Sequence, residues 1–165
     1  MNFVRQYVAS DLGECINIFN RSIREVAIRD YSRRQVAAWA PAIVDTSSWA
    51  ERLSSALALV YVHMDQVLGF IRIEGNHLDM LFVHPAYQRQ GIARALFRHA
   101  VMHGPHDLTA DVSVTARPFF EAIAFRVVKS QFVERYGVKI KNFRMHFNGD
   151  LADWATIQPN HLPSA

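Results

Sequence analysis

The pattern of apolar and polar residues changes period along the chain. Apolar and polar positions roughly alternate over residues 2–8, which predicts a first β-strand. Helical spacing follows and predicts three helices, over residues 12–27, 33–40 and 48–56. Each begins close to side-chain oxygens that can cap a helix: Ser10 or Asp11, Ser32, and Thr46 or Ser47. The second helix has to stop before Pro41.

Strand-like runs dominate the rest of the chain. Residues 57–64 and 67–75 flank Asp65 and Gln66, which predicts a β-hairpin, and Gly75 with Asn76 indicates another turn. The further elements predicted are a strand over 77–85, a helix over 91–104, a strand over 107–114, a short helix over 116–125, and strands over 126–136 and 138–147. This order predicts a mixed sheet with helices on its faces and not a strictly alternating parallel fold.

Length and composition favour one soluble domain. At 165 residues with 50% hydrophobic residues, the chain can bury one substantial core. We expect residues 1–147 to form this domain and residues 148–165, which contain two prolines, to form a C-terminal surface extension. The domain is expected to be a monomer or a homodimer.

The same composition argues against several classes of protein. No apolar run reaches the roughly 18 to 20 residues that span a bilayer, and the N-terminus lacks the layout of a signal peptide. Cys15 is the one cysteine, so an intramolecular disulfide is impossible and a reducing cytoplasm is the simplest location. The net charge of +3 comes from scattered basic residues, so we predict no nucleic-acid partner. Neither a membrane nor a metal is implied.

A polar, basic loop interrupts the second half of the chain. In "HPAYQRQGIARALF", residues 84–97, an apolar strand is followed by a proline, a run of polar residues, one glycine and then a helix. Unpaired N–H groups at a helix N-terminus carry the positive end of the helix dipole and suit a pyrophosphate. Gly91 would let the loop approach phosphates without a clash from Cβ, and Arg89 and Arg94 can screen their charge.

The loop matches the motif Gln/Arg-x-x-Gly-x-Gly/Ala after a strand, with Gln88, Arg89, Gln90, Gly91, Ile92 and Ala93. With this motif the sequence resembles the GNAT superfamily of acetyl-CoA-dependent N-acetyltransferases. The resemblance covers about residues 2–147. It implies an α/β (α+β) GNAT fold, with a mixed, mostly antiparallel sheet of about seven strands flanked by four or more helices. "YSRRQVAAWAP", "LDMLFVHP" and "VTARPFFEAIAF" further resemble a bacterial subgroup of small, uncharacterised acetyltransferases.

The resemblance also implies how acetyl-CoA is held as co-substrate. The strand before the loop parts from its neighbour in this family and offers backbone groups to the pantetheine arm. Ser113 stands where a coenzyme-contacting asparagine is frequent. The coenzyme-binding residues implied are Leu81, Phe82, Val83, Gln88, Arg89, Gln90, Gly91, Ile92, Ala93, Arg94, Ser113, Thr115 and Phe120.

Acetyl transfer to an amine needs a neutral nucleophile and therefore a base. Family members often use a carboxylate on the strand before the loop, at the position of His77 here, and Asp79 follows two residues later. Strand alternation predicts that His77, Asp79, Leu81 and Val83 share one face. His77 and Asp79 are both candidate bases, and Glu74 is a third. Cys15 is expected to be a core residue because these enzymes attack directly, without an acyl-enzyme.

One departure affects the acid that protonates the thiolate. The family often has a tyrosine where Phe120 stands, and a glycine where Ala124 precedes Phe125. Phe120 cannot donate a proton, so water, Ser113, Thr115 or another side chain such as Tyr136 would have to do so.

The acceptor is less determined than the coenzyme. Tyr31 and Trp39, with Trp49, could form an aromatic wall for it, and Asp30 or Asp45 could pair with a cationic amine. The leading hypothesis is direct acetyl transfer to a primary amine of a small molecule or a protein. The alternatives are a preference for another acyl-CoA, and a catalytically weak CoA-binding sensor or protein-interaction module.

Overall fold

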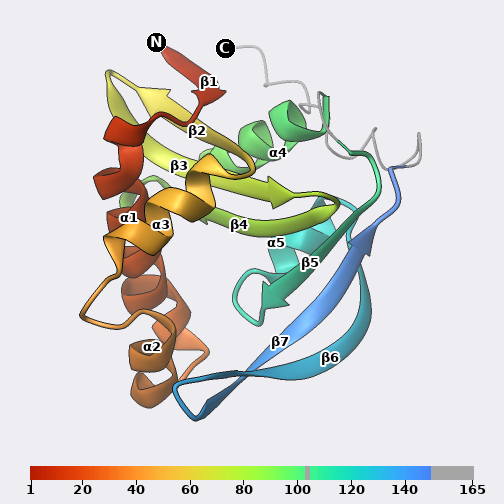
Figure 1. Ribbon diagram of the computed structural model, residues 1–165. Helices are drawn as coiled ribbons and strands as arrows, with labels where there is room; N and C mark the ends of the chain where they lie inside the picture. Colours follow the sequence, from red (N-terminus) through yellow and green to blue (C-terminus); the bar gives the residue numbers. More distant parts are fainter. Residues whose placement is uncertain (103–104, 150–165) are drawn as a thin grey trace.

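The computed structural model describes residues 1–102 and 105–149. Within these ranges the chain forms a seven-stranded sheet in the order β1-β2-β3-β4-β5-β7-β6 (Figure 1). Its strands are β1 (Asn2–Gln6), β2 (Leu57–His63), β3 (Gln66–Glu74), β4 (His77–Val83), β5 (Leu108–Ser113), β6 (Arg126–Arg135) and β7 (Val138–Phe147). Of these neighbours only β4 and β5 are parallel, so the mixed, mostly antiparallel sheet is confirmed.

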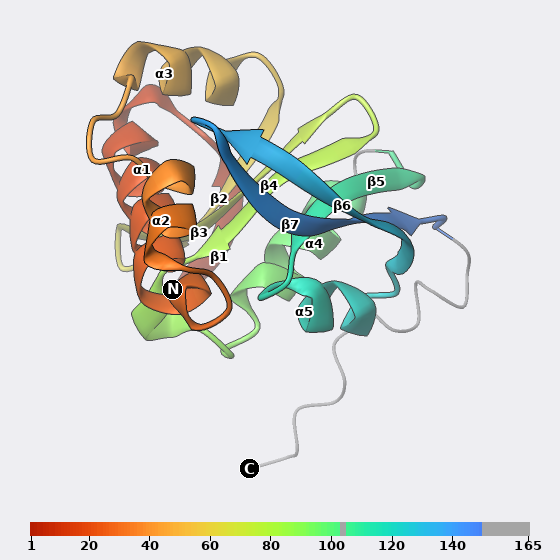
Figure 2. The same ribbon diagram turned by 90° about the horizontal axis from the view of Figure 1, so that it is seen from below.

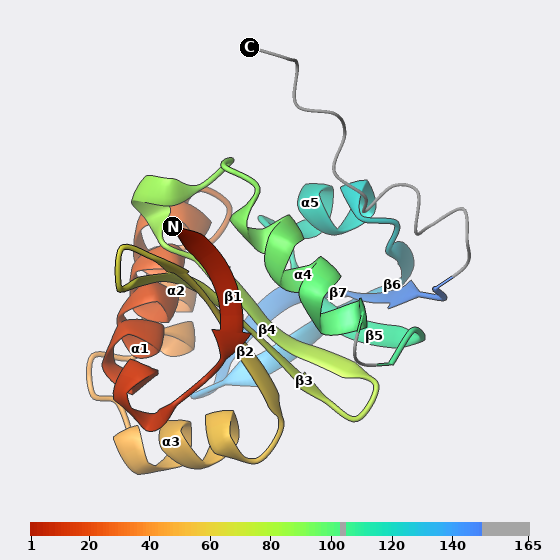
Figure 3. The same cartoon turned by 90° about the horizontal axis from the view of Figure 1, so that it is seen from above.

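Helices cover both faces of the sheet (Figures 2 and 3). Helices α1 (Leu12–Arg21), α2 (Arg33–Trp39) and α3 (Thr46–Ser54) lie on one face, and α4 (Ile92–Met102) and α5 (Arg117–Ala122) lie on the other. A π-helical turn (Ser22–Val26) and a 3-10 turn (Ala27–Arg29) extend α1 toward α2. π-helical turns inside helices are frequent at functional sites.

Helix starts follow local capping chemistry, with one shift from the predictions. Ser32 caps α2 as expected, in a capping box with Gln35. The N-cap of α3 is Asp45 and not Thr46 or Ser47, because the Asp45 carboxylate accepts the Ser48 N–H at 3.0 Å. The predicted stop of α4 at Gly104 and Pro105 falls partly outside the described residues.

The turn between β2 and β3 also differs from the prediction. Met64 and Asp65 both have positive φ, of 46° and 63°, as the central residues of a tight hairpin require. Gln66 already belongs to β3. The side chains gave little sign of this shift, because aspartate is a usual residue for such a turn but methionine is not.

Two clusters of buried apolar residues cover the two faces of the sheet. On the α4 and α5 face, Leu96, Phe97 and Phe125 pack with residues from six strands. On the opposite face, Cys15 and Ile18 of α1 and Leu53 of α3 pack on β2, β3 and β4. The second cluster holds α1 and α3 over β4, where the site lies, and a third cluster packs Val36 of α2 with Ile140 of β7.

Part of the sequence lies beyond what the structure describes. The predicted C-terminal extension falls almost entirely there, because residues 150–165 are outside the described ranges, and it stays a prediction. Within residues 1–102 and 105–149, no helix is long and apolar enough to cross a membrane.

Candidate active site

Strands β4 and β5 part shortly after they begin. They pair only through His77 with Thr109 and Leu78 with Ala110. Beyond these pairs β4 stays bonded to β3, and β5 stays bonded to β7. Alternate backbone groups of an edge strand point away from its partner, so residues 80–82 can present hydrogen-bonding groups to the opening, whereas the Val83 carbonyl accepts the Ser22 hydroxyl at 2.9 Å.

A β-bulge at the start of the opening changes which way β4 faces. Ile73 pairs with Leu78 and Arg72 pairs with Met80, so Asp79 is an extra residue in β4. Leu78 therefore packs on the α4 side, whereas Met80 packs on the α1 side.

The bulge makes the expected alternation wrong. His77 and Asp79 lie toward α3 and the cavity, but Leu81 and Val83 pack against the α4 cluster. Phe82, between them, packs on the opposite face against Phe19, with ring centroids 5.0 Å apart. The extra residue reverses the alternation of every following side chain.

A cavity of about 410 Å³ opens at this point, on the side of α1 to α3. Its walls come from α1, the segment that joins α2 to α3, both parted strands and the β6–β7 hairpin. Exposed apolar side chains stand at its rim, Ile43 at 90% and Tyr136 at 81% exposure. The cavity is about the size of a small-molecule site.

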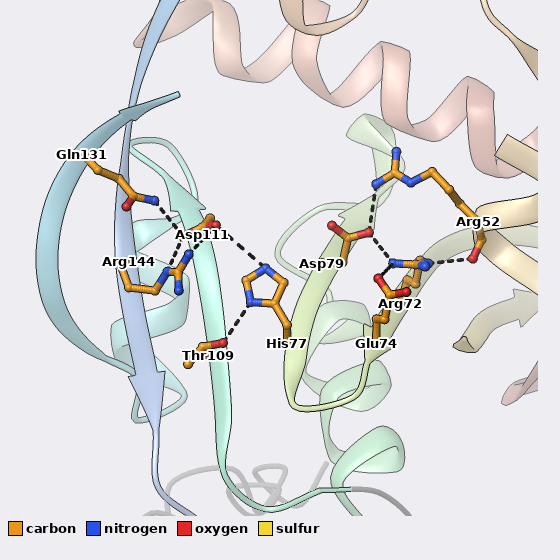
Figure 4. A network of polar contacts seen from close by, with 9 residues as sticks. All are labelled: Arg52, Arg72, Glu74, His77, Asp79, Thr109, Asp111, Gln131 and Arg144. Atoms are coloured by element: carbon orange, nitrogen blue, oxygen red, sulfur yellow. Dashed lines mark hydrogen bonds and ion pairs between the residues drawn. The ribbon is translucent and has the colours of Figure 1, made fainter. Parts of the chain in front are cut away.

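Asp79 belongs to a network of charges on one side of the opening (Figure 4). Its Oδ2 accepts hydrogen bonds from Arg72 at 2.7 Å and from Arg52 of α3 at 2.9 Å. Arg72 is only 3% exposed and also donates to the Arg52 carbonyl and to Glu74. Asp79 therefore balances a buried cation.

Glu74, the third candidate base, lies outside the cavity. Its side chain is 66% exposed and contacts Arg72 at 3.2 Å. Of the three candidates, His77 and Asp79 line the cavity, whereas Glu74 is not among the lining residues. The position of Glu74 does not suit a base acting in the cavity.

His77 faces the other side of the opening (Figure 4). Its Nδ1 lies 2.9 Å from the hydroxyl of Thr109, and its Nε2 lies 3.9 Å from Oδ2 of Asp111. Asp111 is held by Arg144, whose Nε donates at 2.6 Å, and by Gln131 at 2.7 Å. If Nδ1 donates to Thr109, Nε2 can accept a proton, and Asp111 stands close to the resulting charge.

The predicted acceptor residues line the cavity, but one hydroxyl is already engaged. The Tyr31 hydroxyl donates to the Lys141 carbonyl at 2.7 Å and accepts from the Val114 N–H at 2.8 Å. Burial raises the pKa of Tyr31, against the lowering effect of the Val114 N–H. Tyr31 therefore offers its ring, and Trp39 packs edge-on against that ring at 5.5 Å.

The polar loop lies at the far end of β4, before α4. Arg89, Gln90 and Gly91 are exposed, and Arg89 and Gly91 both have positive φ, of 64° and 81°. A Cβ on Gly91 would meet nothing within 4 Å, so the space above this glycine is open. A non-glycine residue in the left-handed region is uncommon, and such residues occur in turns, helix ends and binding loops.

The other predicted coenzyme residues surround this loop and the opening. Ile92 is buried in the core, so only its backbone could contact a ligand, and Ala93 and Arg94 lie half-buried beside it. Ser113, at the end of β5, lines the cavity and accepts the Ala116 N–H at 3.0 Å. The Thr115 hydroxyl donates instead to Asp30.

Phe120 lies buried at the edge of the cavity, and Ala124 ends the same helix. The N–H of Phe125 bonds to the Phe120 carbonyl and that of Ala124 to Glu121, with Ala124 at φ 71°. This is a Schellman motif, which explains why glycine is common at that position in the family. Phe125 packs on Phe120 with ring centroids 5.0 Å apart, and this is the hydrophobic contact that often accompanies a Schellman motif.

Two other predictions concern Cys15 and metals. Cys15 is fully buried, and burial raises the pKa of its thiol to about 12, so it is a core residue as expected. Among the described residues, no three His, Cys, Asp or Glu side chains gather in a way that could hold a metal ion.

Several polar residues of the site escaped sequence reasoning. They come from four different elements: Arg52, Arg72, Asp111, Asn142 and Arg144. Arg72 alone left a signal, as a charge inside the apolar run "VLGFIRI". The positions of the others in the site depend on strand register and, for Arg52, on helix packing, which the sequence does not display.

Comparisons with known proteins agree with this architecture. The family model described as "Acetyltransferase (GNAT) domain" matches residues 27–147. The uncharacterized N-acetyltransferase YafP of Escherichia coli is 38% identical over 144 residues, which are 87% of this chain and 94% of YafP.

Solved structures show the same fold. A GCN5-related N-acetyltransferase from Rhodopseudomonas palustris superposes with a TM-score of 0.83 at 31% identity, covering 89% of this chain and 95% of that one. YncA of Salmonella typhimurium, a putative acetyltransferase solved with its cofactor acetyl-CoA, has a TM-score of 0.66 at 19% identity, covering 99% and 98%. The family match, the extent of the YafP match and the parted strands agree: the chain belongs to the GNAT superfamily of N-acetyltransferases.

Proposed function

We propose that the protein transfers an acetyl group directly from acetyl-CoA to a primary amine of a small molecule or a protein. The observation that carries this proposal is the parting of β4 from β5 beside a cavity of about 410 Å³. The exposed loop follows β4, the strand that borders the opening. A pyrophosphate at the loop, a pantetheine arm in the opening and an acceptor in the cavity would then bind along one path.

The residues of the chain fit acetyl-CoA. The N-terminus of α4 and the open space above Gly91 suit a pyrophosphate, and residues 79–83 of β4 have no partner in β5 along the opening. YncA shares the fold, with a TM-score of 0.66, and was solved with its cofactor acetyl-CoA. Acetyl-CoA supplies the activated acetyl thioester, and the chain has to orient that thioester and to deprotonate the amine.

His77 is the base that we favour. Its Nε2 can take a proton from the acceptor amine while the Thr109 hydroxyl orients the ring. Asp111, 3.9 Å away, would stabilise the charge that the ring acquires. The bonds that the Asp79 Oδ2 accepts from two arginines assign that residue a structural role.

One observation favours a second function. Phe120 cannot protonate the thiolate, and the nearby Tyr31 hydroxyl is engaged with the backbone. A CoA-binding sensor or protein-interaction module with little turnover would tolerate this arrangement. Solvent protonation of the thiolate would instead allow turnover without a tyrosine.

A thermal-shift measurement tests coenzyme binding. Acetyl-CoA at about 100 times its Kd should stabilise the fold by about 2.7 kcal/mol and raise Tm by roughly 5 °C or more. Gly91→Glu should abolish this shift, because it places a side chain and a negative charge in the loop. Gly75→Glu is the matched control: Gly75 also has a positive φ, of 59°, with open space around it, but lies in the β3–β4 turn. No shift in the unmodified protein would overturn the coenzyme assignment.

An amine panel separates the two functions. The panel should contain small amines, amino acids and peptides with free N-termini or lysines, and free CoA should be measured as it forms. At least one amine should be acetylated. Tight acetyl-CoA binding without any acetylated amine would favour the sensing module.

A further inference from the structure

Asn142 is a buried polar residue of the cavity that the mechanism above does not use. It lies in β7, paired in register with Ser113 of β5 and Gln131 of β6. Its side chain is on the same face as Ile140, which packs with α2, and it lines the cavity. Only 9% of the residue is exposed.

The carboxamide oxygen of Asn142 has no partner. Among the described residues, Asn142 Oδ1 is the one buried side-chain polar atom that lacks a hydrogen bond. Nearly all buried polar groups in folded proteins are hydrogen-bonded, so an exception needs an explanation.

The neighbouring polar groups are directed elsewhere. Ser113 accepts from the Ala116 N–H, and Gln131 donates to Asp111. The Tyr31 hydroxyl bonds to the backbone of residues 114 and 141. The fold itself therefore leaves the Asn142 oxygen unsatisfied, and in this conformation the oxygen is itself buried, although the residue lines the cavity.

We infer that Asn142 binds the acceptor and that its carboxamide oxygen accepts an N–H of the acceptor amine. This inference rests on the proposed function for the identity of the ligand as a primary amine. A primary amine carries the N–H groups that a carboxamide oxygen accepts, and rotation of the carboxamide about its Cβ–Cγ bond can present that oxygen to the cavity. Asn142 is thus a specificity-determining residue.

The position of Asn142 favours the acceptor over the coenzyme as its ligand. Helix α4, which follows the polar loop, lies on the opposite face of the sheet, and β5 separates β7 from β4. Asn142 lies instead on the side of Tyr31 and Trp39, which line the same cavity. The pantetheine amides are the other possible source of an N–H, and the experiment below separates the two.

The test measures binding without turnover. The protein, saturated with CoA, is heated with n-butylamine, glycinamide or a lysine-containing pentapeptide as the probe, and the further rise in Tm is recorded. At least one probe should raise Tm in the unmodified protein. Asn142→Leu, close in shape but without polar atoms, should lose this rise and keep the shift caused by CoA alone.

Two further readouts distinguish binding from a structural role. Asn142→Leu without any ligand should melt at the same temperature as the unmodified protein or higher, because it removes an unsatisfied buried group. With an acetylated amine, its KM for that amine should rise at least tenfold while kcat changes less than threefold. Asn142→Asp, which keeps an accepting oxygen, should restore most of the affinity.

Each outcome decides the inference. An unchanged amine shift in Asn142→Leu overturns it, as does the absence of any amine shift in the unmodified protein. A lost CoA shift assigns Asn142 to the coenzyme instead. An amine shift that requires Asn142, in a protein that acetylates no amine, upholds the inference while the proposed function fails.

Discussion

Asp79 and Asp111 lie on opposite sides of the opening and have similar hydrogen-bond partners. Each carboxylate is held by arginine: Asp79 by Arg52 and Arg72, and Asp111 by Arg144 with Gln131. Their surroundings differ in two respects. Arg72 is 3% exposed whereas the Arg144 side chain is 38% exposed, and only Asp111 has a histidine within 4 Å.

The comparison favours a structural role for Asp79 and a role beside the proposed base for Asp111. A buried guanidinium that loses its counter-charge is strongly destabilising, so the fold needs Asp79. Arg144 is partly hydrated and depends less on Asp111. Asp111 can therefore serve His77, which lies between the two clusters (Figure 4).

The largest expected effect comes from His77. His77→Gln can keep a hydrogen bond to Thr109 but cannot take up a proton, so we expect kcat to fall at least about 100-fold, within the usual range for a general base. Free CoA released in the presence of an acetylated amine measures this rate. The Tm shift with acetyl-CoA should be unchanged. A variant with nearly full activity would remove His77 from the base role.

Removing the charge of Asp79 should act on stability. Asp79→Asn should lower the free energy of unfolding by about 2 kcal/mol, because it weakens charge-assisted bonds to a buried arginine. Urea unfolding measures the loss. Glu74→Gln is the matched control, since Glu74 contacts the same Arg72 but is 66% exposed, and we expect less than about 0.5 kcal/mol.

Kinetics of the Asp79→Asn variant complete that test. Its rate should depend on pH as in the unmodified protein. A rate that falls as far as in His77→Gln would make Asp79 the base and reverse the comparison. Equal stability of the Asp79→Asn and Glu74→Gln variants would refute the structural role.

Asp111→Asn should have a smaller effect on the rate. The variant keeps an oxygen for Arg144 but loses the negative charge near His77, so kcat should fall about tenfold, or 1.4 kcal/mol in the barrier. The loss should disappear in the His77→Gln background, because Asp111 acts through that ring. Additive losses in the double variant would contradict this.

A third pair of aspartate and arginine, Asp11 and Arg5, is not among the residues that line the cavity. Its loss should have the smallest effect and serves as a reference for the other two pairs. Burial alone would raise the pKa of the Asp11 carboxyl, but bonds from Arg5 at 2.7 and 2.8 Å and from the Val8 N–H lower it below its usual value. A lowered pKa stabilises the fold above the unfolded-state pKa of about 3.9, and this contribution is lost as pH falls through the folded-state value.

Arg5→Met should therefore cost about 1 kcal/mol at pH 7 and less at pH 2, because the contribution is lost as the carboxyl becomes protonated in the folded state. Urea unfolding at the two pH values measures the difference, and acetyl transfer at pH 7 should be unaffected. The same loss of stability at both pH values would show that packing of the Arg5 side chain, and not its charge, matters.

The loop and the elements around it could be predicted from the sequence because their causes are local. Gln88, Gly91 and the apolar spacing of α4 follow one another along the chain, and Ser32 and Gln35 cap a helix from three residues apart. The order of strands and helices then favoured a mixed sheet. These signals do not depend on which segments meet in space.

The catalytic side could be predicted only as candidates. The sequence left the choice between His77 and Asp79 open and offered Glu74 as a weaker third candidate. The bulge at Asp79 then overturned the expected alternation for Leu81 and Val83. The bulge depends on how β4 pairs with β3, and no residue type in β4 predicts it.

The sequence by itself determined the order of elements along the chain and the loop proposed to hold a pyrophosphate, because short-range spacing and turn chemistry encode them. Its resemblance to a family motif in that loop indicated the superfamily. Only the tertiary structure decided that Asp79 balances a buried arginine, that His77 faces Asp111, and that Asn142 keeps an unsatisfied oxygen at the cavity. These properties arise from groups on four strands and a helix that are far apart in the chain. Their burial and pairing exist only after the sheet has formed.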